Sequence, residues 1–108
     1  MNLLELSCAP QHGAAPLAEQ TVKQLLAGLP GWEIQGIELV KTFPFGNFHD
    51  TMAFVNALAW IAHREDHHPD MSVHYNRAVV RFSTHDAGGL TLNDFICAAK
   101  TEALLGRP

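Results

Sequence analysis

Residues 63–70 read HREDHHPD and bring together several side chains that could transfer protons or bind a metal. This run holds three of the chain's seven histidines and three carboxylates, and it includes a proline near its end. Histidine suits proton transfer near neutral pH because its unperturbed pKa lies close to neutrality. The run therefore admits three interpretations: an acid–base centre, a metal site, or the charged end of a helix.

The metal interpretation would use His63, His67, His85 and Asp70 as a zinc-binding set. The HxxxH spacing of the first two histidines is half of a metalloprotease signature, but Arg64 stands where that signature has glutamate. A cation beside the first ligand opposes metal binding. The helix-end interpretation needs no function, since a helix dipole stabilises histidines near its C-terminus. We favour an acid–base centre and predict no metal, while His63 alone stays open to the helix-end interpretation.

The spacing of the histidines predicts how they face one another. His63 and His67 are four apart at the end of an expected helix, so they should point to the same side. His67 and His68 point apart unless the helix unwinds, which Pro69 favours. His85 lies where an expected strand meets a glycine-rich loop, a place where a rigid scaffold often presents functional side chains.

The elements that position these histidines follow from local signals. Asn47 suits the N-cap of a long helix with Asp50 in its first turn, and Pro69 blocks continuation of that helix. Helical spacing and strand-like alternation predict the other elements. Helices are expected at residues 17–29, 47–66 and 91–106, and hairpins at residues 32–43 and 71–84.

The expected hairpin turns are Gln35-Gly36 and Asn76-Arg77, and Thr91 is the expected N-cap of the last helix. The resulting order is α-β-β-α-β-β-α. We predict an α+β fold with a four-stranded antiparallel sheet and three helices packed on one face. Residues 1–15 are predicted to be a loose leader, and residues 16–108 a single domain.

Composition and charge exclude several classes of function. The chain has 108 residues, 47% of them hydrophobic, which suits one folded domain with a single core. The net charge is −4 and the seven Lys and Arg are scattered, so we expect no nucleic-acid partner. The sequence holds no apolar run long enough for a membrane span. Cys8 and Cys97 are far apart and are predicted to be free thiols in a reducing compartment, so we expect a cytoplasmic protein.

The pattern H-x-x-x-H-H-P at residues 63–69, followed by Tyr75, His85 and Asp94, resembles the pterin-4a-carbinolamine dehydratase family. The resemblance covers about residues 17–105 and includes GW at 31–32, FPFGNF at 43–48 and STHDAGGLT at 83–91. It implies dehydration of 4a-hydroxytetrahydrobiopterin to quinonoid dihydrobiopterin and water, in tetrahydrobiopterin recycling. It implies no metal and no other cofactor.

The resemblance also implies a role for each residue. His67 and His85 take the positions of the acid–base histidines and His68 that of the pterin-contacting histidine, and these three form the expected catalytic set. The expected substrate-binding set is His63, Asp66, Pro69, Ser83, Thr84 and Asp94. Asp94 could organise the His85 loop, or it could be a plain carboxylate in the first turn of a helix. Many members of the family carry glutamate at the position of His63 and an aromatic residue at that of Met71.

As partners, the resemblance implies a pterin substrate, a homodimer or homotetramer, and a functional link to an aromatic amino-acid hydroxylase. The residues agree with self-association, because open sheet edges need covering. Ala53, Ala57 and Trp60 either form a second apolar face on the long helix or leave Trp60 as a single exposed tryptophan, and both alternatives stay open. The alternative function is a non-catalytic binding, assembly or coactivator protein, since one fold can host several functions. The complete histidine set favours the enzyme.

Overall fold

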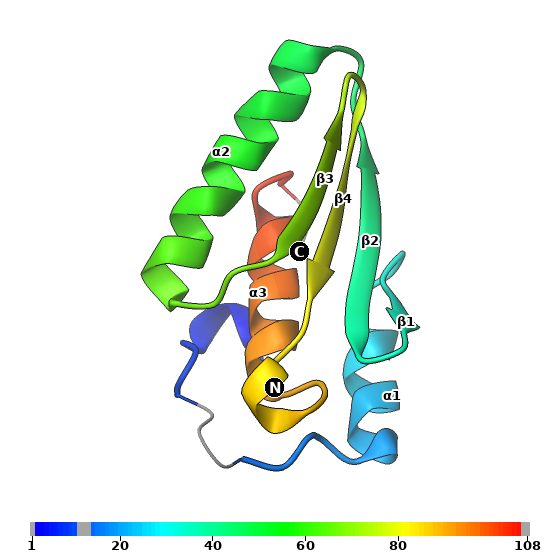
Figure 1. Cartoon of the computed structure of the whole chain (residues 1–108), viewed down its shortest axis with the longest axis vertical. Helices are drawn as coiled ribbons and strands as arrows, with labels where there is room; N and C mark the ends of the chain where they lie inside the picture. Colours follow the sequence, from blue (N-terminus) through cyan, green and yellow to red (C-terminus); the bar gives the residue numbers. More distant parts are fainter. Residues whose placement is uncertain (1, 11–13, 107–108) are drawn as a thin grey trace.

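The computed structural model describes residues 2–10 and 14–106, and it confirms the predicted order of helices and strands (Figure 1). The helices are α1 (Glu19–Ala27), α2 (Phe48–Glu65) and α3 (Leu92–Ala103). The strands are β1 (Glu33–Gln35), β2 (Glu38–Pro44), β3 (Asp70–His74) and β4 (Arg77–Phe82). Two short 3-10 helices are added, η1 (Leu3–Glu5) and η2 (His85–Ala87). Within the described ranges, no helix is long and apolar enough to cross a membrane.

The four strands form one antiparallel sheet in the order β1-β2-β4-β3. The two hairpins meet in the middle of the sheet, where β2 pairs with β4 and Phe43 lies opposite Ala78. Helices α2 and α3 contact each other and both contact β4, so they form a layer on one face (Figure 1). The α+β class and the sheet are as predicted.

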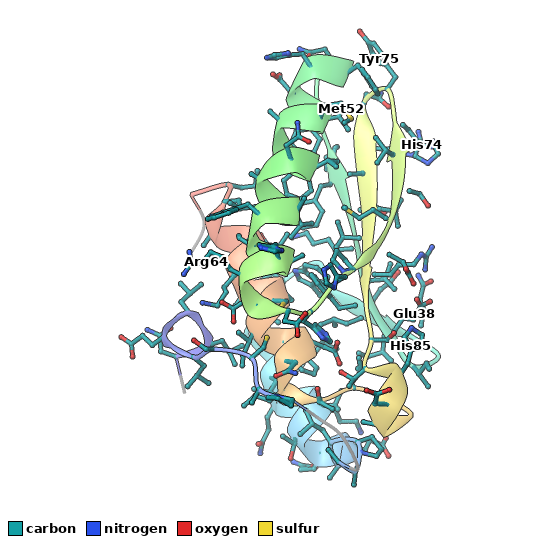
Figure 2. The ribbon with its side chains drawn as sticks, turned by 60° about the vertical axis from the view of Figure 1, so that its left-hand side comes forward. Glu38, Met52, Arg64, His74, Tyr75 and His85 are labelled. Atoms are coloured by element: carbon teal, nitrogen blue, oxygen red, sulfur yellow. The ribbon has the colours of Figure 1, made fainter. Side chains whose placement is uncertain are left out.

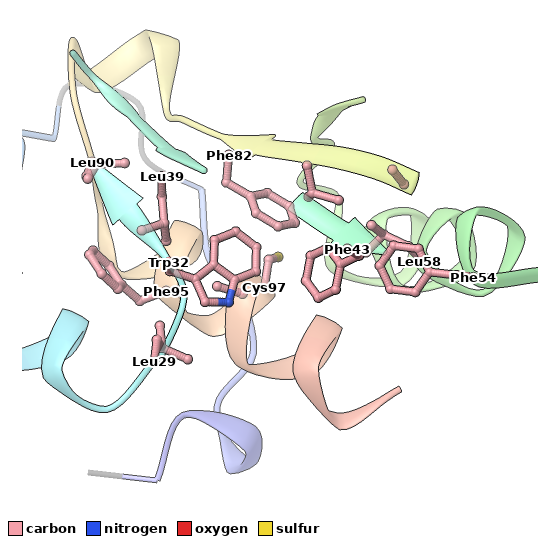
Figure 3. Packing of buried hydrophobic residues seen from close by; sticks show 13 residues of the cluster. Leu29, Trp32, Leu39, Phe43, Phe54, Leu58, Phe82, Leu90, Phe95 and Cys97 are labelled. Atoms are coloured by element: carbon pink, nitrogen blue, oxygen red, sulfur yellow. The ribbon is translucent and has the colours of Figure 1, made fainter. Parts of the chain in front are cut away.

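The core lies between this sheet and the helices (Figure 3). Phe43 and Phe82 come from the two central strands and Phe95 from α3, and each is at most 1% exposed. Trp32 packs edge-on against Phe43 and donates a hydrogen bond from Nε1 to Glu102 Oε1 at 2.9 Å. The partly buried Lys41 forms an ion pair with Glu102, so both Trp32 and Lys41 bind this buried carboxylate. Large aromatic rings therefore hold β4 and α3 in place, and these two elements flank the loop that carries His85.

Local signals place the starts of α2 and α3 where they were expected, whereas α1 starts at Glu19, two residues later than predicted. Asn47 Oδ1 accepts the Asp50 amide hydrogen at 2.8 Å, and Thr91 with Asp94 forms a capping box at the start of α3. The hairpin turns differ by one residue from the prediction. They lie at Gly36-Ile37 and Tyr75-Asn76, because Gln35 pairs with Glu38 and His74 pairs with Arg77.

The segment expected to be a loose leader makes specific contacts with α3 where the structure describes it, in residues 2–10. Asn93 binds Ala9 twice, accepting its amide hydrogen at 3.1 Å and donating to its carbonyl oxygen at 2.7 Å. Lys100 Nζ donates to the carbonyl oxygen of Leu4 at 3.3 Å. Residues 1 and 11–13 of this leader lie outside the described residues, and the domain boundary at residue 16 stays a prediction.

Candidate functional site

Helix α2 ends before the histidine doublet, and this end decides where His67 points. Asp66 caps the helix in the left-handed conformation, with φ 51° and ψ 43°, which aspartate tolerates better than most residues. The next amide, that of His67, donates to the Ala62 carbonyl oxygen at 3.1 Å. Residues 67–69 have no regular secondary structure, and the chain enters β3 at Asp70. His67 is therefore directed toward α3 and the sheet rather than along the surface of α2.

His67 is held by a carboxylate on one side and an aromatic ring on the other. Its Nε2 lies 2.6 Å from Asp94 Oδ1, and its side chain is 11% exposed. Its ring stacks on Phe82 with the planes 10° apart and the centroids 6.0 Å apart. Because an ionised carboxylate only accepts hydrogen bonds, Asp94 selects the tautomer with hydrogen on Nε2. Nδ1 is then the ring nitrogen left to accept a proton.

Asp94 is itself fixed by three hydrogen-bond partners. It is fully buried, and its second oxygen, Oδ2, accepts from the Thr84 hydroxyl and from the Thr91 amide, both at 2.9 Å. The Thr91 hydroxyl lies 2.8 Å from that of Thr84, so the two threonines form a continuous network with the carboxylate. Asp94 stands in the first turn of α3, where the helix dipole favours a negative charge. The carboxylate is thus more than a first-turn cap, because it connects α3 to His67 and to the end of β4.

His85 follows directly on this network, since it comes one residue after Thr84. It is exposed at the start of η2, and its Nε2 lies 3.4 Å from the Ser83 hydroxyl oxygen. The loop closes through a bridge between Thr84 and Gly89, and Gly88 takes a φ of 71° that suits glycine. Figure 2 shows His85 at the end of the sheet opposite His74 and Tyr75. The His85 imidazole is therefore accessible to solvent, while the two ends of its loop are held together by the Thr84–Gly89 bridge.

The other predicted residues have different surroundings. His68 and His63 are exposed, and the His63 ring lies 6.3 Å from that of Trp60 on the outer side of α2. The expectation that His63 and His67 share one helix face is wrong, because α2 ends at Glu65 and Asp66 turns the chain. Pro69 is half-buried. Sequence spacing of four predicts a shared face only where the helix continues.

A cavity of about 280 Å³ lies beside His67. Of the predicted residues, Asp66, His67 and Thr84 line it, whereas the remaining ones do not. The sequence did not predict the other lining residues, which are Cys8, Ala9, Pro10, Glu65, Asp86 and Asn93. Cys8 donates its amide hydrogen to Glu65 Oε1 at 2.8 Å, so the N-terminal segment forms one wall. No local signal could have placed this segment there, since its partners lie 57 and 84 positions away.

The titrating groups around the cavity are mostly acidic. Glu65 and Asp66 come from the end of α2 and Asp86 from η2, and they line the cavity together with His67. Behind the wall, a hydrogen bond with Cys8 and burial raise the pKa of the Cys97 thiol far above its ordinary value. Among the described residues, no group of three or more His, Cys, Asp or Glu side chains could hold a metal ion.

The amino-acid sequence of this chain is similar to those of many other proteins. Residues 15–104 match the family model described as pterin 4 alpha carbinolamine dehydratase. A protein of Chromobacterium violaceum is 82% identical over the full length of both chains, and one of Stenotrophomonas maltophilia strain R551-3 is 61% identical over 94% of this chain and 90% of its own. Both carry the provisional name pterin-4-alpha-carbinolamine dehydratase.

Two solved structures have a similar fold. One, from Brucella melitensis, is described as a transcriptional coactivator/pterin dehydratase; it has a TM-score of 0.79, 32% identity, and covers 82% of this chain and 97% of that one. The other is a pterin dehydratase-like protein described as a RuBisCO assembly factor of the alpha-carboxysome. It has a TM-score of 0.59 and 24% identity over 71% of this chain and 89% of its own, so it shares the fold.

Proposed function

The chain belongs to the pterin 4 alpha carbinolamine dehydratase family, and we propose that it dehydrates 4a-hydroxytetrahydrobiopterin to quinonoid dihydrobiopterin and water. The observation that carries this proposal is the His67–Asp94 pair beside a cavity. A buried carboxylate that holds one imidazole nitrogen leaves the other nitrogen oriented for proton transfer. The reaction would belong to the recycling of tetrahydrobiopterin.

The chemistry requires two proton transfers. The hydroxyl group at C4a must gain a proton to leave as water, and a nitrogen of the pterin ring must lose one. His67 is oriented by Asp94 and Phe82, and His85 stands on the loop that Thr84 anchors. We assign the two transfers to these histidines, each of which would contribute about 10²–10⁴-fold to the rate. The reaction moves protons and water without changing the redox state, so it calls for no redox cofactor.

The remaining site residues are proposed to contact the substrate or to position the two acid–base histidines. His68 is exposed beside His67 and would contact the pterin, which keeps it in the catalytic set. Thr84 and Asp94 would act through the hydrogen bonds that fix the two acid–base histidines. Asp66 lines the cavity. His63, Pro69 and Ser83 are proposed at its margin on their sequence positions next to the lining residues.

We propose that the protein acts in the cytoplasm as a homodimer or homotetramer, downstream of an aromatic amino-acid hydroxylase. Support for self-association comes from two surfaces. Trp60 is 62% exposed on α2, and β3 is an outer strand of the sheet with Val73 40% exposed. Unpaired outer strands and large exposed aromatic side chains are common where subunits meet.

A second candidate is a non-catalytic binding or assembly role. It is favoured by the description of the Brucella protein, which combines a coactivator with a pterin dehydratase. The two candidates differ in what they require of the histidines. A binding role gives no reason for an imidazole oriented by a buried carboxylate, whereas proton transfer benefits from that orientation.

The deciding experiment generates 4a-hydroxytetrahydrobiopterin in situ and follows its decay at neutral pH. Wild type is expected to accelerate the decay strongly, and His67→Ala and His85→Ala should each lose about 100-fold or more. His74→Ala is the matched control, because this histidine lies at the opposite end of the sheet (Figure 2). A folded wild type that does not exceed buffer would refute the catalytic proposal and leave the binding role.

A further inference from the structure

Two cysteines that are 89 positions apart in sequence meet behind the wall of the cavity. Cys8 Sγ lies 3.5 Å from Cys97 Sγ, and both are free thiols. Cys97 stands in the middle of α3 and is fully buried in the core (Figure 3). Cys8 is half-buried and lines the cavity. One thiol of the pair is thus within reach of a small molecule in the cavity, and the other is directly behind it.

We propose that Cys8 and Cys97 form an oxidative modification site, at which a hydroperoxide such as hydrogen peroxide converts the two thiols into an intramolecular disulfide. The disulfide would fasten residues 8–10 to α3 and fix one wall of the cavity beside His67. Disulfides in reducing compartments are usually transient and redox-sensing, so a reversible bond suits a cytoplasmic protein. Formation of the disulfide does not depend on the dehydratase reaction; its effect on substrate access rests on that proposed function.

The chemistry balances in two steps. The Cys8 sulfur attacks one oxygen of the peroxide, so that an S–O bond forms, the O–O bond breaks, and the second oxygen leaves as water with the thiol proton. The Cys97 sulfur then attacks the sulfur of the Cys8 sulfenic acid. The S–S bond forms, the S–O bond breaks, and the hydroxyl group leaves as water with the Cys97 proton. Two thiols and one peroxide yield one disulfide and two waters.

The surroundings of the two thiols favour this order. The hydrogen bond with Cys8, burial and the charge of Cys8 all raise the pKa of Cys97, so Cys97 stays protonated while Cys8 reacts. The hydrogen bond and the charge both come from the Cys8 sulfur, so both change once that sulfur carries a hydroxyl group. The remaining charges that face Cys97 are the carboxylates of Glu65 and Asp94. The Cys97 sulfur lies 3.5 Å from the Cys8 sulfur and is therefore positioned to attack the sulfenic acid.

The bond requires a short movement that the N-terminal segment can make. A disulfide has a sulfur–sulfur length of about 2.05 Å, so the two sulfurs must approach by roughly 1.5 Å. Cys97 is fixed in a helix, but Cys8 lies in a segment without helix or strand. That segment is held to Glu65 and Asn93 by hydrogen bonds at Cys8 and Ala9, which already draw it toward α3. The reduced protein therefore holds the pair close to bonding geometry.

The test treats the reduced full-length protein with increasing hydrogen peroxide, blocks free thiols with iodoacetamide, and maps the peptides by mass spectrometry. We expect loss of two hydrogen atoms, one Cys8–Cys97 crosslinked peptide, and full reversal by dithiothreitol. Cys97→Ala should instead accumulate a sulfenic acid on Cys8 that dimedone traps. Cys8→Ser should leave Cys97 unmodified, because Cys97 is buried.

A second measurement tests whether the disulfide holds residues 8–10 on α3. Oxidised wild type should melt several degrees higher than reduced protein, about 5–15 °C, and the Ala9 amide should exchange more slowly with deuterium. Neither change should occur in Cys97→Ala. Peroxide that yields only overoxidised or intermolecularly linked Cys8 would overturn the proposal, as would a crosslink that leaves Ala9 exchange unchanged. None of these readouts uses pterin turnover, so failure here is separate from failure of the dehydratase proposal.

Discussion

His67 Nε2 and Asp94 Oδ1 lie 2.6 Å apart although the two residues are 27 positions apart in sequence. One comes from the turn after α2 and the other from the first turn of α3. The contact joins the HHP run to the start of the last helix and, through Thr84, to the end of β4. Asp94 therefore fixes the tautomer of the His67 imidazole.

Replacement of Asp94 by asparagine should reduce both activity and stability. The amide keeps the size of the carboxylate but replaces one of its two accepting oxygens with a donor NH2 group. That group must face either His67 or the pair Thr84 and Thr91. We expect a loss of about 1–3 kcal/mol in the free energy of unfolding and at least 10-fold in kcat. Urea denaturation and the pterin assay measure these effects.

Asp50→Asn is the matched control for that variant, because Asp50 occupies the same position in the first turn of α2 and is exposed. It should leave dehydration unchanged and cost only a fraction of a kcal/mol. Equal activity of Asp94→Asn and wild type would show that the carboxylate does not position His67.

Replacement of His85 by alanine should separate catalysis from stability. The side chain is exposed and makes one long contact with Ser83, so the free energy of unfolding should change by less than about 0.5 kcal/mol. The rate of dehydration should fall about 100-fold or more. Thermal melting together with the decay assay checks both, and a large loss of stability would instead mark His85 as a structural residue.

Replacement of Asn93 by alanine should loosen the N-terminal wall of the cavity. It removes both hydrogen bonds to the backbone of Ala9 and should cost about 1–2 kcal/mol. The amides of the N-terminal segment should exchange faster with deuterium, and KM for the pterin should rise more than kcat falls. Asn56→Ala on the exposed side of α2 provides the comparison. Unchanged exchange would show that other contacts hold the segment.

Stability should fall at alkaline pH because of Cys97. Its pKa is raised in the folded protein above the ordinary value of 9.0 by the hydrogen bond to Cys8, by burial and by the Cys8 charge. Above pH 9 the unfolded chain loses this proton while the folded chain keeps it, so unfolding becomes more favourable as pH rises. The loss is at most about 1.4 kcal/mol per pH unit from this group.

Urea denaturation in the presence of reductant, from pH 8 to about pH 10.5, measures that dependence. The decline should be shallower in Cys97→Ala than in wild type. Parallel curves for the two proteins would mean that other groups, such as lysines and the tyrosine, account for the whole decline.

The helices and strands of this protein could be predicted from the sequence, because their signals are local. Alternation and helical spacing gave the order α-β-β-α-β-β-α, and the caps at Asn47 and Thr91 gave the helix starts. Pro69 correctly predicted that α2 stops before the end of the histidine run. The helix ends at Glu65, before the proline, because Asp66 takes a left-handed conformation, and this turn separates His63 from His67. The family resemblance rested on the same local motifs and is confirmed by the match over residues 15–104.

Contacts between residues far apart in sequence could not be predicted, because they depend on how the helices and the sheet pack together. Asp94 could have been a plain first-turn carboxylate until packing of α3 placed it on His67. Cys8 and Cys97 gave no pairing signal, and a segment without periodicity docked on α3 through backbone hydrogen bonds to Asn93. Such contacts are fixed by how the whole core packs, and a pattern over a few neighbouring residues holds no information about a partner dozens of positions away.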